Sequence, residues 1–107
     1  MSQEDLKADV SKSALKLCKD RISNKSAVAL PEILSSIHNQ LEWLVSYFEG
    51  KNNDRDKFKT LVFGHYAAQE VDHKDKEFVN ALYNAAYVAD QTAKGLKVDV
   101  SKLQNDS

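Results

Sequence analysis

The sequence predicts an all-α protein, a compact bundle of about four mostly antiparallel helices. Three observations support this fold class. The chain has 107 residues, which suits a single small domain with a modest core. Its three glycines and one proline are too few for the many turns of an all-β fold. Apolar residues also recur every three or four positions in four separate segments.

The first helix is expected from Gln3 to Ser23. Ser2 is placed to act as its N-cap, because a serine side chain accepts a hydrogen bond from the first helical turn. An apolar stripe follows the helical spacing along this segment. The stripe consists of Leu6, Val10, Ala14, Leu17, Cys18 and Ile22.

The second helix is expected to begin near Ser26 or Pro31 and to end at about Glu49. Proline is well tolerated in a first helical turn, and Gly50 stands where a glycine often ends a helix. This segment has the strongest helical periodicity in the chain. Its apolar residues are Leu30, Ile33, Leu34, Ile37, Leu41, Leu44, Val45 and Phe48.

The third helix is expected over roughly residues 56–70, after a polar linker at residues 51–54. Gly64 in its middle weakens this prediction, since glycine lowers helix stability by up to ~1 kcal/mol relative to alanine. One side of this segment is apolar or weakly polar. That side carries Phe58, Leu61, Val62, His65 and Gln69.

The fourth helix is expected from about Asp75 to Lys94, with Asp75 as its cap and Gly95 at its end. Its stripe contains several alanines, which would let a neighbouring helix come close. Residues 1–100 are therefore expected to form a single helical domain, and residues 101–107 a mobile polar tail.

Composition narrows the classes of partner and compartment. The net charge is −1, and no helix is rich enough in lysine and arginine to indicate binding to nucleic acid or to a membrane surface. The single cysteine, Cys18, cannot form an intrachain disulfide, which fits a reducing compartment. The polar, acidic start of the chain does not resemble a signal peptide, and no apolar run reaches the ~20 residues of a membrane span. We therefore expect a soluble cytoplasmic protein.

Two aromatic pairs lie away from the predicted core stripes. Trp43 and Tyr47 are four residues apart on the second helix, and Tyr83 and Tyr87 are four apart on the fourth. Tryptophan and tyrosine are enriched among the residues that dominate binding energy. Either pair is thus a candidate docking surface, although aromatic side chains at the edge of a small core are also common.

An acidic cluster follows the third helix and contains Glu70, Asp72, Asp75 and Glu77. It would suit a basic cleft on a partner, and it would equally suit helix capping and a solvated turn. The sequence Glu70-Val71-Asp72-His73 also fits the Glu-x-x-His motif of di-iron bundles, but such sites need two copies and further carboxylates. No metal site, no cofactor and no catalytic residue is therefore expected, and Cys18 lies on an apolar stripe rather than beside a base.

A last feature of the sequence is a set of five short stretches: Asp54-Arg55, Glu70-Val71-Asp72, Ala81-Leu82, Ala86-Tyr87-Val88 and Gly95-Leu96-Lys97-Val98-Asp99. Through these stretches the chain resembles a known family, the small helical immunity proteins that neutralise type VI secretion toxins. The likeness is closest to those that neutralise NAD(P)-glycohydrolases. It is most specific at residues 95–99, and it covers a little over half of the chain.

The resemblance implies a cytoplasmic binding protein without catalytic activity, which covers the active-site cleft of a cognate toxin domain. The expected toxin contacts are Tyr83, Tyr87, Asp90, Glu70 and Asp72, followed by Trp43 and Tyr47. A second interpretation is a helical regulatory or assembly module that forms a homo-oligomer through the same aromatic faces. An enzyme is the third.

Overall fold

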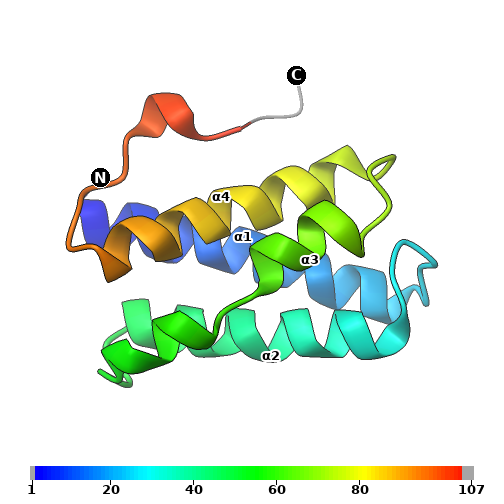
Figure 1. Cartoon of the computed structure of the whole chain (residues 1–107), viewed down its shortest axis with the longest axis horizontal. Helices are drawn as coiled ribbons and strands as arrows, with labels where there is room; N and C mark the ends of the chain where they lie inside the picture. Colours follow the sequence, from blue (N-terminus) through cyan, green and yellow to red (C-terminus); the bar gives the residue numbers. More distant parts are fainter. Residues whose placement is uncertain (1, 105–107) are drawn as a thin grey trace.

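The computed structural model describes residues 2–104, and these form four α-helices and two short 3-10 helices. The long helices α1 (Gln3–Ser23), α2 (Pro31–Phe48) and α4 (Lys76–Ala93) lie side by side, with α1 antiparallel to both others (Figure 1). The short helix α3 (Phe63–Gln69) packs against α2 and α4. The predicted all-α bundle is confirmed.

The ends of the long helices follow the predicted signals. Ser2 Oγ accepts a hydrogen bond from the Asp5 amide at 3.1 Å and caps α1. Asp75 Oδ1 accepts from the Phe78 amide at 3.3 Å and caps α4. Gly50 and Gly95, which follow α2 and α4, have φ angles of +77° and +72°, a conformation that glycine adopts without steric cost.

The third segment is not the single helix that the sequence predicted. It consists of the 3-10 helix η1 (Arg55–Thr60), an extended residue at Leu61, and then α3. The break is stabilised from α2, because Gln40 Oε1 accepts hydrogen bonds from the Val62 and Phe63 amides at 2.7 and 3.0 Å. A side chain of a different helix therefore satisfies the first free amides of α3.

The core lies between the three long helices and is closed on one side by η1 and α3. The predicted stripes of α2 and α4 supply most of it, but Ile22 and Leu30 are 40% and 58% exposed. Ser11 is fully buried instead, with its hydroxyl donating to the Lys7 carbonyl at 2.8 Å. The largest fully buried side chains are Phe63, Phe78, Ile37, Leu41, Leu44, Leu82 and Val88.

After α4 the chain continues as a strap, residues 95–104, which includes the 3-10 helix η2 (Val100–Lys102). The strap runs along the side of α4 that faces away from α2 (Figure 1). Its last described residue, Gln104, exchanges two hydrogen bonds with the Asn84 side chain, of 2.7 and 2.8 Å. The mobility predicted for the tail stays a prediction, and residues 105–107 lie outside the described residues. Within residues 2–104, no helix has the length and apolar character to cross a membrane.

Candidate functional site

The first predicted aromatic pair, Trp43 and Tyr47, lies beneath η1. The two rings are 5.6 Å apart, and the Phe58 ring meets them edge-on at 5.1 Å from Trp43 and 4.8 Å from Tyr47. Both side chains are half-buried, and Lys57 Nζ lies 5.7 Å from the Trp43 ring. The pair therefore supports η1 against α2, and both side chains remain partly accessible.

Arg55 joins this aromatic cluster to α4. Its Nη1 donates to the Tyr47 hydroxyl at 3.1 Å, and its Nη2 donates to the carbonyls of Thr92 and Ala93 at 2.9 and 3.3 Å. Those carbonyls belong to the last turn of α4, where the Thr92 carbonyl also accepts from the Gly95 amide at 3.0 Å. The guanidinium thus adds hydrogen bonds to the carbonyl groups at the end of α4 and holds η1 beside this helix.

The second aromatic pair has two different environments. The Tyr87 hydroxyl accepts a hydrogen bond from the Asp99 amide at 3.0 Å and so belongs to the attachment of the strap. Tyr83 is half-buried and packs against the core. Asp90, one turn beyond Ala86, is exposed and forms an ion pair with Lys94 at 2.9 Å. The predicted trio on α4 therefore shares one helix but not one surface.

The predicted acidic contacts Glu70 and Asp72 lie at the other end of the bundle, where α3 leads into α4. The Asp72 amide donates to the Val28 carbonyl at 2.7 Å, and Asp72 Oδ1 accepts from the Lys74 amide at 2.9 Å. His73 Nε2 lies 3.0 Å from the Ala67 carbonyl oxygen. Most of this corner is therefore a hydrogen-bonded turn, while the Glu70 side chain is exposed.

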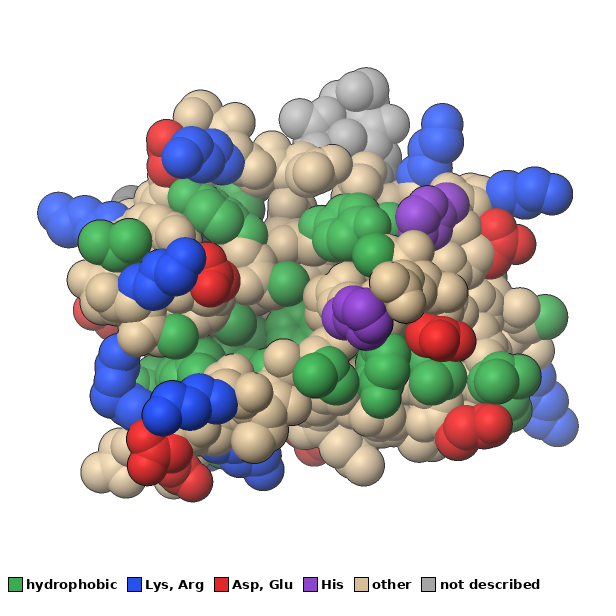
Figure 2. Space-filling model, in the orientation of Figure 1, with side chains coloured by type: hydrophobic (Ala, Val, Ile, Leu, Met, Phe, Trp, Pro, Cys, Tyr) green, Lys and Arg blue, Asp and Glu red, His purple; other side chains and the backbone are tan. Residues whose placement is uncertain are grey.

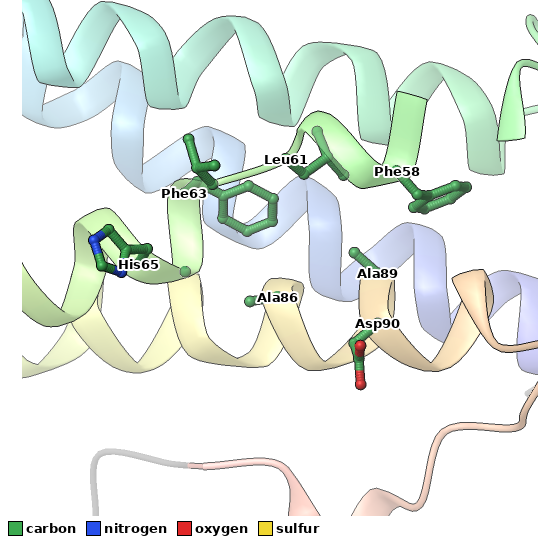
Figure 3. A pocket seen from close by; sticks show the side chains of 9 residues that line it. Phe58, Leu61, Phe63, His65, Ala86, Ala89 and Asp90 are labelled. Carbon is green, nitrogen blue, oxygen red and sulfur yellow. The ribbon is translucent and has the colours of Figure 1, made fainter. Parts of the chain in front are cut away.

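A groove that the sequence analysis did not predict opens between α4 and the η1–α3 segment. It has a volume of about 230 Å³. Figure 2 shows hydrophobic side chains in a hollow near the middle of this face. In Figure 3, Leu61 and Phe63 reach toward the groove from one side, and Ala86 and Ala89 from α4 on the other. The lining is completed by Phe58, Val62, Gly64, His65 and Asp90.

Of the predicted contacts, only Asp90 lies in this groove. The others were assigned to helix faces, whereas the groove exists because Leu61 interrupts the third segment. The one signal for it in the sequence was Gly64, a glycine in the middle of a helical pattern, which can mark a close approach of two backbones.

Titratable groups with a shifted pKa lie in structural contacts. Arg21 Nε and Nη2 donate to both carboxylate oxygens of Asp75 at 2.7 and 2.9 Å, and these hydrogen bonds hold the pKa of Asp75 below its usual value. Burial raises the pKa of the Cys18 thiol to about 11, so the reactive thiolate is scarce at neutral pH. No histidine, cysteine or carboxylate group within residues 2–104 gathers with two others as a metal site would require.

The comparisons with known proteins agree with one another. The family model Tsi6 matches residues 7–91. The immune protein Tsi6 of Pseudomonas aeruginosa is 36% identical over 87 residues, which cover 81% of this chain and 89% of that protein. A chain from the solved structure of Tse6 in complex with Tsi6 aligns with a TM-score of 0.77 and 33% identity, over 88% of this chain and 97% of that chain.

Proposed function

The chain belongs to the Tsi6 family, and from this premise we propose that it is an immunity protein that binds and inhibits a cognate toxin domain. The observation that carries the proposal is the 36% identity to an immune protein across 89% of its length. The structural neighbour supports it, because that structure contains Tsi6 in complex with Tse6 and the matching chain is covered over 97% of its length.

We propose further that the toxin is an NAD(P)-glycohydrolase delivered by type VI secretion, and that the inhibitor covers its active-site cleft so that the dinucleotide cannot enter. The support is the resemblance at residues 95–99, together with α4 residues such as Tyr87. In this proposal the protein acts in the cytoplasm of the producing cell and catalyses nothing itself.

Inhibition of such a toxin requires tight binding, because even a small fraction of unbound toxin would consume the cell's own dinucleotide. Nanomolar affinity corresponds to about −12 kcal/mol, which an interface of ~1,600 Å² with a few strong contacts can supply. A rigid surface helps, since fewer side chains must be ordered on binding. The contacts of Arg55 and the ring cluster around Phe58 hold η1 in this way.

Among the predicted toxin contacts, we favour those with side chains still accessible in the free protein. Asp90 and Glu70 are exposed, and Tyr83 is half-buried. The hydroxyl groups of Tyr47 and Tyr87 already have partners within the chain. Tyr83→Ala is therefore expected to weaken toxin binding while the far-ultraviolet helical signal is kept.

The test is co-expression with the toxin domain encoded beside this gene, followed by purification and an NAD(P) hydrolysis assay with and without the inhibitor. A stable complex that abolishes hydrolysis is the expected result. A stable complex with a toxin that never consumes NAD(P) would retain immunity and reject the glycohydrolase assignment. The absence of any complex would reject immunity, and a homo-oligomer seen by light scattering would then favour a helical assembly module.

A further inference from the structure

We propose that the groove between α3 and α4 is the main contact surface for the toxin, and that it takes an apolar side chain of the toxin flanked by a lysine or arginine that pairs with Asp90. This inference rests on the proposed function. It assigns the partner to one face of the bundle and names the chemistry that this face recognises.

The lining of the groove is mostly apolar. Leu61, Phe63 and Ala89 form an apolar floor, and Val62 at the rim is 41% exposed. A volume of about 230 Å³ has room for a single large side chain. Apolar pockets of this kind, edged by a few polar groups, are where binding energy concentrates in protein interfaces.

The charge of the groove lining suits a cationic partner. Asp90 and His65 are the titratable residues of the lining, which contains no lysine or arginine. A cleft that binds a dinucleotide must attract its phosphates, so it presents cations or helix N-termini. A surface that covers such a cleft is best served by a carboxylate, whereas the hollow between the end of α1 and the start of α2 is edged by Arg21 and Lys25.

Asp90 is available for such a pair. Its partner in the free protein is Lys94, and both side chains are more than half exposed, at 57% and 60%. Exposed ion pairs of this spacing contribute little to stability. A toxin cation that is brought into the groove would be shielded from water and would compete well with Lys94.

Two other sides of α4 are already covered. One side packs against α1, and the strap covers another through hydrogen bonds with Asn84, Tyr87 and Gln91. The side next to α3 is the one on which the groove opens (Figure 3). A partner can therefore reach Ala86, Ala89 and Asp90 without displacing any described segment.

The test compares charge-introducing variants at matched exposed positions. Val62→Lys and Asp90→Lys place a cation at the groove, whereas Val100→Lys makes the same change on the strap, where Val100 is 62% exposed. Leu30→Lys places a cation beside Glu70 and Asp72, at the turn between α3 and α4, and so tests that region as the contact. Leu30 is 58% exposed. These side chains are not buried, so each variant should keep the circular dichroism spectrum and melting temperature of the wild type.

Binding of the purified toxin domain is measured by calorimetry, and protection by the hydrolysis assay. We expect Val62→Lys and Asp90→Lys each to weaken binding by about tenfold or more, and Val100→Lys to change it less than about twofold. Wild-type-like binding by both groove variants, with loss in Leu30→Lys, would overturn the inference and move the contact to the corner.

Two further outcomes keep this inference separate from the proposed function. If the wild-type protein binds no toxin, the proposed function fails, whatever the variants do. If light scattering shows a homodimer that Val62→Lys dissociates while toxin binding is unchanged, the groove takes a second copy of this chain, which would overturn the inference and leave immunity intact.

Discussion

A Cβ atom placed on Gly64 of α3 would lie 2.8 Å from the Cβ of Ala86 on α4. Carbon atoms in contact are normally about 3.5–4.0 Å apart. The two helices therefore cross at a point that has room for glycine against alanine and for nothing larger. This crossing holds α3 beside α4 and so sets the width of the groove between them.

Gly64→Ala should destabilise the protein, even though alanine favours the helical state by about 1 kcal/mol. Overpacking of this kind costs about 1–3 kcal/mol, so the net change in the free energy of unfolding is expected to be unfavourable. Urea unfolding followed by circular dichroism measures it. The double variant Gly64→Ala/Ala86→Gly restores the space and should recover most of the loss. A Gly64→Ala protein as stable as the wild type would show that α3 can move away from α4 without cost.

The sequence alone predicted the bounds of α1, α2 and α4 closely, because each helix buries its own apolar stripe and has its own capping residue, proline or glycine near its ends. It was not sufficient for the third segment. The break at Leu61 depends on Gln40, which lies 22 residues before Val62 and caps α3 across space. No local pattern reveals such a contact, so Gly64 was taken as a weak point of a helix rather than as a close crossing.

The same limit applies to the candidate site. The helical spacing correctly placed Trp43 away from the main stripe of α2, but it could not show that Phe58 of η1 covers this side. Tyr87 likewise lies off the core stripe because the strap is attached there, through the Asp99 amide. In the free protein, Trp43, Tyr47 and Tyr87 thus have contacts within the chain, and their contact with a toxin stays a prediction.

The ion pair between Arg21 and Asp75 should make stability depend on pH in the acid range. The hydrogen bonds from Arg21 lower the pKa of Asp75 in the folded state, while an unfolded aspartate has a pKa of about 3.9. The folded state therefore gains stability above pH ~4, and this gain is lost as the pH falls through the lower, folded pKa. Both side chains are largely shielded from water, at 16% and 15% exposed.

Asp75→Asn isolates this contribution, because asparagine keeps the N-cap of α4 and removes the charge. At pH 7 we expect the variant to be less stable by about 1–2 kcal/mol. The difference from the wild type should shrink as the pH is lowered from 5 to about 2. Chemical unfolding at a series of pH values measures it, and a difference that stays constant over this range would mean that the pair does not shift the Asp75 pKa.

Arg55 should be poorly replaced by lysine. Its guanidinium contacts the Tyr47 hydroxyl and two carbonyls at the end of α4, whereas a lysine amine has one nitrogen with which to reach them. Arg55→Lys is expected to cost about 1 kcal/mol, and Arg55→Ala somewhat more. Tyr47→Phe, which removes a single contact, is the matched control and should cost less than either. Thermal unfolding gives the melting temperature of each variant and so tests this ranking. A lysine variant as stable as the wild type would contradict the prediction.

The first turn of α1 is joined to the strap through the side chain of Gln3. Gln3 Oε1 accepts from the Val98 amide at 2.8 Å, and Gln3 Nε2 donates to the Val98 carbonyl at 3.2 Å. Val98 is 5% exposed, so its backbone groups have limited access to water. Gln3→Ala leaves both unpaired and should lower the free energy of unfolding by about 1–2 kcal/mol. Gln3→Glu keeps the acceptor for the Val98 amide but loses the donor, and it places a carboxylate beside the Val98 carbonyl, so it should also destabilise the protein.

Hydrogen exchange of the Val98 amide measures this contact directly. Faster exchange of this amide in Gln3→Ala than in Gln3→Glu would show that the amide is protected through the Gln3 acceptor, whereas unchanged exchange in both would show that the strap is held without Gln3.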